Sequence, residues 1–225
     1  MRAYLYWFLL AGVPLTFWAQ WRLLSAYRRW SRQACATRPL TGAQAAREIL
    51  DAADLAHVPV ERTSGFLTDH YDPRARVLRL SAAVHDTDSL AAVGIAAHET
   101  GHALQHRELY WPMRARLALM PLTRVGAWLA LPLLVLGLVL RIPPLMRLGL
   151  VLFVLLLLFQ LVTLPLEFDA SRRAGRLLRE RSMLAPQELE GVGQVLDAAA
   201  WTYIAAFTMS FLQLLRIGPP ARLQS

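Results

Sequence analysis

Two histidines and a glutamate have the types and spacing for metal chemistry: the chain reads His98-Glu99-Thr100-Gly101-His102. The apolar periodicity around them predicts a helix, and residues four apart on a helix lie on one face, one turn apart. Both imidazoles can therefore bind one tetrahedral zinc ion, with Glu99 turned away from the pair. Zinc lowers the pKa of a bound water toward neutrality, and Glu99 would accept its proton as the water attacks a carbonyl. The pattern predicts a Zn²⁺ site suited to hydrolysis.

A chance match on a helical surface is the alternative, because a five-residue pattern also occurs at random. The stretch around the motif is strongly apolar, so two histidines and a glutamate would be buried there without partners, which is costly. His106 follows on the same face, but it lies about 12 Å from His98 by helix rise, too far to share the ion. It is expected beside the site or at the surface. These observations favour zinc over chance.

A third ligand has to come from elsewhere in the chain, because Gln105 and Glu108 occupy the positions of the glycine and last histidine in the longer metzincin pattern. Two acids, Glu167 and Asp169, end a long apolar stretch. Acids at a membrane boundary are candidate functional residues. The alternative is that they form ion pairs with the two arginines that follow them. At this point either carboxylate is a candidate ligand.

Three segments in this order resemble the YugP-type neutral zinc metallopeptidases of bacterial membranes, which look distantly related to the HtpX and CAAX-prenyl endopeptidases: 65–73 with 78–81, 94–106 and 165–174. The resemblance covers most of the chain. It implies a gluzincin-like site with His98, His102 and Glu167 as zinc ligands and Glu99 as general base. Asp169 lies about 200° further around the helix, so it is expected to orient a ligand from outside the coordination shell.

The stretch 66–81 is typical of two short strands joined by a turn at 72–74. Such a hairpin offers an edge along which an extended peptide could pair through its backbone. His70 or Tyr71 is then the expected donor to the oxyanion, in a catalytic role. The alternative is that the polar cluster 69–72 consists only of turn residues.

Two helices should flank the hairpin. Thr41 and Gln44 form a capping-box pattern that predicts a helix to about Ala56. Ser89 predicts the start of the helix that carries the histidines, which should end at about Arg107.

Uncharged stretches alternate with arginine-rich segments in this chain of 225 residues, 56% of them hydrophobic. A helix needs about 20 apolar residues to cross a bilayer, which indicates transmembrane helices at 1–24, 117–140 and 146–166. The stretch 196–216 holds more polar residues, so it either spans the membrane or forms a buried amphipathic helix. A cleaved signal peptide is the alternative for 1–24, but that stretch lacks a small-residue cleavage site.

Arginine placement predicts the orientation, since one arginine precedes the first span and five follow it by Arg38. With the N-terminus outside, the block 40–116 and the segment 167–195 are cytoplasmic. The block should be a small zincin-like α+β domain, and 167–195 a helix that carries the third ligand. The expected fold class is mainly α: a polytopic membrane protein with three to four transmembrane helices.

Charge and cysteine content narrow the possible functions. The net charge is +8, all 24 basic residues are arginine, and Cys35 is the only cysteine, which excludes a disulfide framework and a cysteine-based zinc cluster. The arginines flank membrane spans, so the expected partners are a peptide or membrane-protein substrate and the lipid bilayer, not nucleic acid.

The leading hypothesis is a zinc endopeptidase at the cytoplasmic face of the bacterial inner membrane. It would cleave membrane or misfolded proteins through Glu99-assisted attack of a zinc-bound water. One alternative is a catalytically silent scaffold or chaperone that keeps zinc for stability. Another is a basic membrane-surface protein that binds anionic lipid or RNA, with a steep salt dependence and no need for metal.

Overall fold

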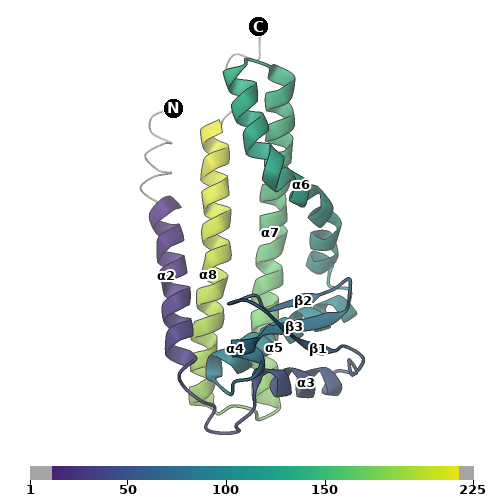
Figure 1. The fold of residues 1–225 in the computed structure, drawn as a ribbon, viewed down its shortest axis with the longest axis vertical. Coiled ribbons are helices and arrows are strands. Elements are labelled where there is room, and N and C mark those ends of the chain that lie inside the picture. The colour runs from purple at the N-terminus through teal and green to yellow at the C-terminus, as the bar shows by residue number, and fades with distance from the viewer. Residues whose placement is uncertain (1–11, 218–225) are drawn as a thin grey trace. The chain divides into compact units, whose positions relative to one another are not determined.

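The chain is mainly α-helical, and the computed structural model describes its residues 12–217 (Figure 1). The elements in order are α2 (Val13–Trp30), α3 (Gly42–Ala52), β1 (Val60–Thr63), β2 (His70–Asp72), β3 (Val77–Ser81), α4 (Ala82–His85), α5 (Leu90–Arg107), α6 (Trp111–Val139), α7 (Pro143–Glu180) and α8 (Pro186–Ile217). Long helices together with one small sheet confirm the predicted fold class, a mainly α membrane protein with a small α+β region.

The described residues form two compact units, one helical and one with both helices and strands. The helical unit consists of 12–19, 111–165 and 202–217. The α/β unit consists of 20–110 and 166–201. The long helices α7 and α8 contribute to both, and every candidate site residue lies in the α/β unit.

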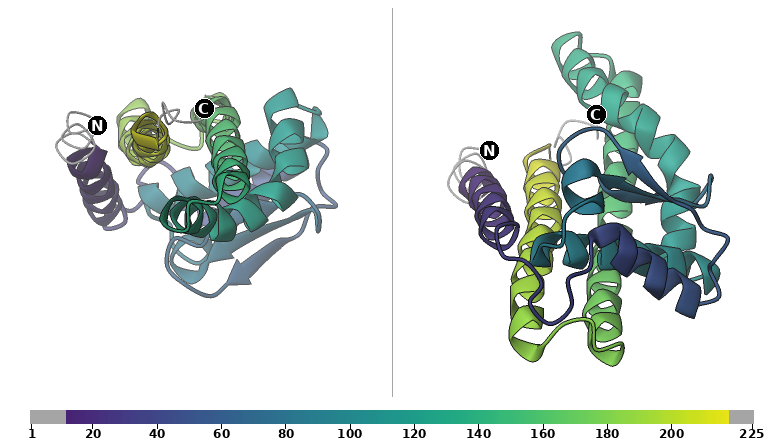
Figure 2. Two further views of the ribbon diagram at one scale, coloured as in Figure 1. Left: turned by 90° about the horizontal axis from the view of Figure 1, so that it is seen from above. Right: turned by 60° about the horizontal axis from the view of Figure 1, so that its bottom comes forward.

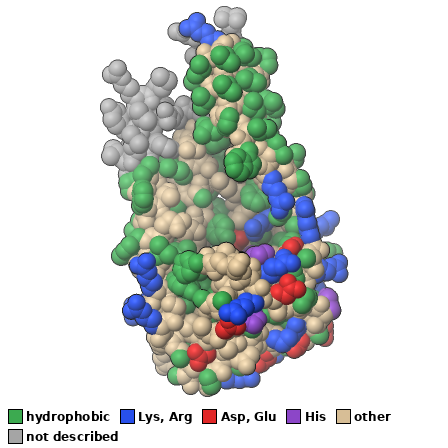
Figure 3. Space-filling model, in the orientation of Figure 1, with side chains coloured by type: hydrophobic (Ala, Val, Ile, Leu, Met, Phe, Trp, Pro, Cys, Tyr) green, Lys and Arg blue, Asp and Glu red, His purple; other side chains and the backbone are tan. Residues whose placement is uncertain are grey.

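The helical unit contains apolar helices. Among the described residues, α6, α7 and the part of α8 from Pro186 to Leu215 are long and apolar enough to cross a membrane. Residues 1–11 of the predicted first span lie outside the described residues, and 13–30 form α2. Helices α6 and α7 approach closely, since a Cβ at Gly149 would lie 2.7 Å from the backbone nitrogen of Leu134. Hydrophobic side chains cover helices α6 and α7 of the helical unit, whereas charged and histidine side chains gather over the α/β unit (Figure 3).

The sheet of the α/β unit has the order β1-β3-β2, so β2 is an edge strand. Strand β2 runs antiparallel to β3, as predicted, with Tyr71 opposite Leu78. Strand β1 runs parallel to β3 and was not predicted. The predicted strand start near residue 66 was wrong, because Gly65 and Leu67 have positive φ angles of 109° and 53°, which a strand does not allow. Asp69 then accepts hydrogen bonds from the backbone N–H and the hydroxyl of Ser81, at 2.7 and 3.0 Å, and closes the base of the hairpin.

Local capping sets the ends of α3 and α5. Thr41 and Gln44 form the predicted capping box at the start of α3. This helix ends at Ala52, earlier than predicted, because Asp54 adopts a left-handed φ of 55°. The Oγ of Ser89 accepts a hydrogen bond at the start of α5, which ends at Arg107 as predicted.

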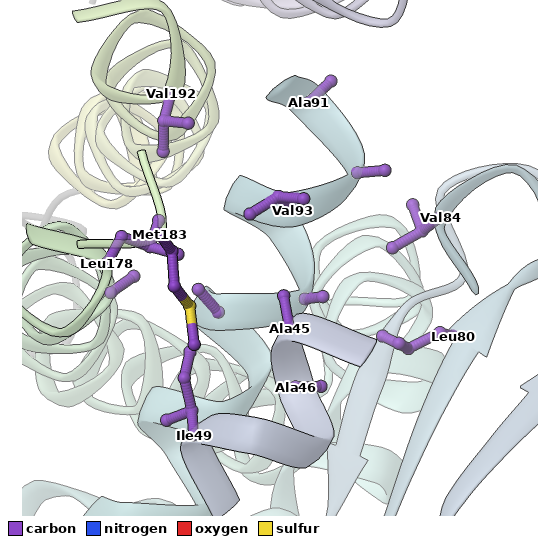
Figure 4. Close-up of a cluster of buried hydrophobic side chains, with 14 of the residues drawn as sticks. Ala45, Ala46, Ile49, Leu80, Val84, Ala91, Val93, Leu178, Met183 and Val192 are labelled. Atoms are coloured by element: carbon purple, nitrogen blue, oxygen red, sulfur yellow. The ribbon is translucent and has the colours of Figure 1, made fainter. Parts of the chain in front are cut away.

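A hydrophobic core surrounds α5. Helix α3 packs along α5, and the sheet contacts it through β2 and β3 (Figures 1 and 2). Figure 4 shows Met183, just after α7, directed toward Ile49 of α3, and Val192 of α8 near Val93 of α5. These side chains are almost completely buried. At Gly101 a Cβ would lie 2.9 Å from the carbonyl oxygen of Ala170, so this glycine lets α5 approach the backbone of α7. That contact brings the motif helix beside Glu167.

Candidate metal centre

Helices α5 and α7 bring three metal-binding side chains together: His98, His102 and Glu167. One ligand atom from each lies within 4.8 Å of the other two. The Nε2 atoms of His98 and His102 lie 3.2 and 3.6 Å from the same oxygen, Oε2 of Glu167. Glu167 and His102 are buried, and His98 is half-buried. The residues singled out from the motif and from the end of the third apolar stretch therefore share one site.

Gln105 holds the Nδ1 atom of His102. The amide nitrogen of Gln105 donates to the carbonyl oxygen of Leu166 at 2.9 Å and to the carboxylate of Asp169 at 2.8 Å. Because both partners are acceptors, Oε1 of Gln105 must face His102, whose Nδ1 lies 2.8 Å away. His102 therefore carries a proton on Nδ1, and its Nε2 is the ring nitrogen directed at Glu167.

Ser171 plays the corresponding part for His98, since its hydroxyl lies 3.1 Å from His98 Nδ1. Both imidazoles thus have their outer nitrogen engaged and their Nε2 directed at the carboxylate. Partners of this kind orient metal-binding histidines.

This donor set fits a zinc ion. Both imidazoles direct Nε2 at one oxygen of a buried carboxylate, so one ion could bind all three atoms. Two imidazole nitrogens and one carboxylate oxygen are a ligand set of catalytic zinc sites, which keep a further position for water or substrate.

Glu99 lies near His98 and Glu167 but is not part of the group of three side chains that could hold a metal ion. It is buried, and its Oε2 accepts a hydrogen bond of 3.0 Å from the backbone N–H of Tyr71 on the edge strand β2. Burial raises the pKa of Glu99 to about 7; His98 opposes this shift, whereas Glu167 and Asp69 add to it. A carboxylate with a pKa near the working pH can both take and return a proton.

The side chains of Tyr71 and His70 make their hydrogen bonds to residues other than the clustered His98, His102 and Glu167. Tyr71 contacts Glu99 through its backbone, while its buried hydroxyl lies 3.0 Å from Nδ1 of His106. Burial raises the pKa of Tyr71 and, together with the charge of Arg76, lowers that of His106, so both are neutral near pH 7. His70 is exposed, with its Nδ1 2.8 Å from the carbonyl oxygen of Thr68. An oxyanion role for either side chain stays a prediction.

Asp169 lies outside the ligand group. It accepts hydrogen bonds from Gln105 and, at 2.6 Å, from Nε of Arg173, which also binds Glu108. Its contact with His102 therefore runs through Gln105.

Sequence reasoning missed the two residues that hold the histidines. Gln105 follows His102 by three residues and Ser171 follows Glu167 by four, so each lies on the same helix face as a ligand. Helical spacing was the available signal.

Comparisons with known proteins identify the family of the chain. The family described as "Putative neutral zinc metallopeptidase" matches residues 5–218. The "Putative membrane protease YugP" of Bacillus subtilis (strain 168) is 44% identical over 208 residues, which is 92% of each chain. No solved structure gives a significant match. The resemblance seen in three segments of the sequence is thereby confirmed, and the chain belongs to this family of neutral zinc metallopeptidases.

Proposed function

We propose that the protein is an integral-membrane zinc endopeptidase that hydrolyses peptide bonds at the cytoplasmic face of the bacterial inner membrane. One observation carries the proposal. A buried glutamate, Glu99, is held by a backbone N–H beside two imidazoles and a carboxylate whose donor atoms converge. This arrangement joins a metal-binding group to a base.

In this proposal His98, His102 and Glu167 hold the zinc ion, which when bound polarises the peptide carbonyl and acidifies a water molecule. Glu99 accepts a proton from the attacking water, while the oxygen of that water forms a bond to the carbonyl carbon. The C–N bond then breaks, and Glu99 delivers the proton to the leaving amine. The N–H of Tyr71 occupies one oxygen of Glu99, which leaves the other oxygen for the proton transfer.

The scaffold or chaperone alternative predicts a different site. A structural zinc ion is closed by four protein ligands and has no use for a base. The group found among the described residues offers three ligands, with Glu99 next to them. The donor set therefore favours catalysis.

Metal analysis of the detergent-purified protein, wild type beside Glu99→Gln, tests the function. Glutamine keeps the shape of the side chain and leaves both imidazoles unchanged, so zinc content should stay at the wild-type level. The rate of casein cleavage should fall about 10²- to 10⁴-fold, because glutamine cannot accept the proton. Wild-type cleavage by the Glu99→Gln protein would refute the mechanism.

A further inference from the structure

A groove runs between α7 and α8 within the α/β unit. It encloses about 310 Å³, at the lower end of ligand pockets. Its lining is mostly apolar and includes Phe168, Ser171 and Gly175 of α7 and Leu189, Gly193 and Leu196 of α8. The lining residues of α7 extend from 168 to 179, which corresponds to about 16 Å by helix rise.

Two glycines keep this groove open. A Cβ added at Gly175 or Gly193 would have no neighbour within 4 Å. By contrast, a Cβ at Gly101 or Gly191 would meet another element at 2.9 or 2.7 Å, so close packing accounts for those glycines. Each glycine in a helix costs about 1 kcal/mol relative to alanine. Packing does not explain Gly175 and Gly193, whereas an occupant of the groove would.

The groove begins beside the metal centre. Ser171 lines it, and the hydroxyl of Ser171 lies 3.1 Å from His98 Nδ1. The Nε2 atom of the same imidazole ring belongs to the cluster of donor atoms.

Arginines give the groove a positive charge. Arg172 and Arg179 line it seven residues apart on α7, hence on one face and about 10 Å apart along the axis. The side chain of Arg172 is 76% exposed and lies 3.9 Å from Asp169, the outer limit of an ion pair. Arg179 is exposed and makes no ion pair with the residues that the structure describes. Asp197 on the α8 side already pairs with Arg22. An extended peptide spans about 10 Å in three residues, so two acids three residues apart would meet both arginines.

We propose that this groove binds an apolar, acid-containing segment of the peptide substrate, on one side of the bond that is cleaved. The proposal rests on the proposed peptidase function, which makes a peptide the molecule next to the metal centre. On α7 the lining starts at residue 168, beyond the predicted span 146–166, whereas on α8 it reaches Ala200, inside the predicted stretch 196–216. A lipid is therefore the competing occupant that the experiment has to separate from a peptide.

Binding of a labelled peptide to the full-length Glu99→Gln protein tests the groove without cleavage. The probe is fluorescein-Leu-Glu-Val-Leu-Glu-Val-amide, beside the same peptide with both glutamates replaced by lysine. Gly175→Leu and Gly193→Leu fill the groove and raise helix propensity, so we expect intact folding and a Kd for the acidic peptide at least about tenfold higher. Gln187→Leu, exposed on α8 outside the groove, should bind like the parent.

Charge reversal provides a second arm. Arg172→Glu and Arg179→Glu should each weaken binding of the acidic peptide about two- to fivefold and strengthen binding of the lysine peptide. Arg176→Glu, exposed between them but outside the groove lining, is the matched control. Unchanged Kd values in both leucine variants, or equal affinity for the two peptides, would overturn the proposal.

The result can be separated from the fate of the peptidase function. If wild type cleaves no peptide but the leucine variants lose peptide binding, the groove assignment stands and the catalytic proposal fails. If wild type is active and the leucine variants bind and cleave normally, the catalytic proposal stands and the groove assignment fails. Loss of phosphatidylglycerol-vesicle binding in Gly175→Leu, with peptide binding unchanged, would assign the groove to lipid and overturn the proposal.

Discussion

The side chain of Gln105 should control zinc affinity although it cannot reach the ion. Its amide makes three short hydrogen bonds, to His102, to the carbonyl of Leu166 and to Asp169. Gln105→Met keeps the length of the side chain and opens no large cavity, but it removes all three bonds. The buried Nδ1–H of His102 then loses its acceptor.

The magnitude follows from that lost acceptor. A buried donor without a partner costs about 1–3 kcal/mol, and His102 can avoid the cost by moving its proton to Nε2, where zinc would bind. Either route weakens zinc binding by about 10- to 100-fold, the range typical for residues that orient metal ligands. The charge of the site is unchanged, so the effect should be insensitive to salt.

Chelator competition with the purified full chain at pH 7.5 measures the zinc Kd. Thr100→Val is the matched control, because Thr100 is equally buried on α5 but its hydroxyl donates only to the carbonyl of Ala96. We expect the zinc Kd of this control to stay within about twofold of wild type. A wild-type Kd for Gln105→Met, or an equal loss in Thr100→Val, would show that the amide does not set the tautomer of His102.

Three further outcomes are expected. Glu167→Ala should lose most bound zinc and Asp169→Ala markedly less by metal analysis; the reverse order would exchange their roles. Burial, followed by two neighbouring carboxylates, raises the pKa of Cys35 to about 12, so the folded thiol keeps its proton where an unfolded thiol loses it. Stability should fall as pH rises from about 9 toward 12, less steeply in Cys35→Ala, as unfolding titrations would show. A reporter fused after Leu40 should be active only in the cytoplasm; activity only in the periplasm would reverse the proposed orientation.

Local signals predicted the part of the site that lies within one helix. Ser89, the apolar periodicity and the spacing of His98 and His102 all act within a few residues, and α5 has the predicted ends. Glu167 could be singled out because it ends a long apolar stretch, where a carboxylate is costly and usually has a function. These features depend on helix periodicity and on the hydrophobicity of membrane spans, and both can be read from neighbouring residues in the sequence.

Local signals could not predict contacts between segments that are distant in the sequence. Strand β1 pairs in parallel with β3, and neither its short apolar start nor the preceding Pro59 indicates a partner. The backbone N–H of Tyr71 reaches Glu99 because of the sheet register, so the residue type at 71 carries no trace of that bond. Gln105 and Ser171 could be recognised only once α5 and α7 were known to be neighbours.

The neutral amide of Gln105 also bears on how electrophilic the centre is. Where a carboxylate holds a metal-binding imidazole, it shares negative charge with the ring and makes it a stronger electron donor to the metal. An amide offers only a dipole. Two imidazoles and one carboxylate would then leave a bound Zn²⁺ with a net charge of about +1, to which the amide of Gln105 adds no charge. Such a centre withdraws electrons strongly, so water and carbonyl groups bound there would be activated more than at a carboxylate-supported zinc.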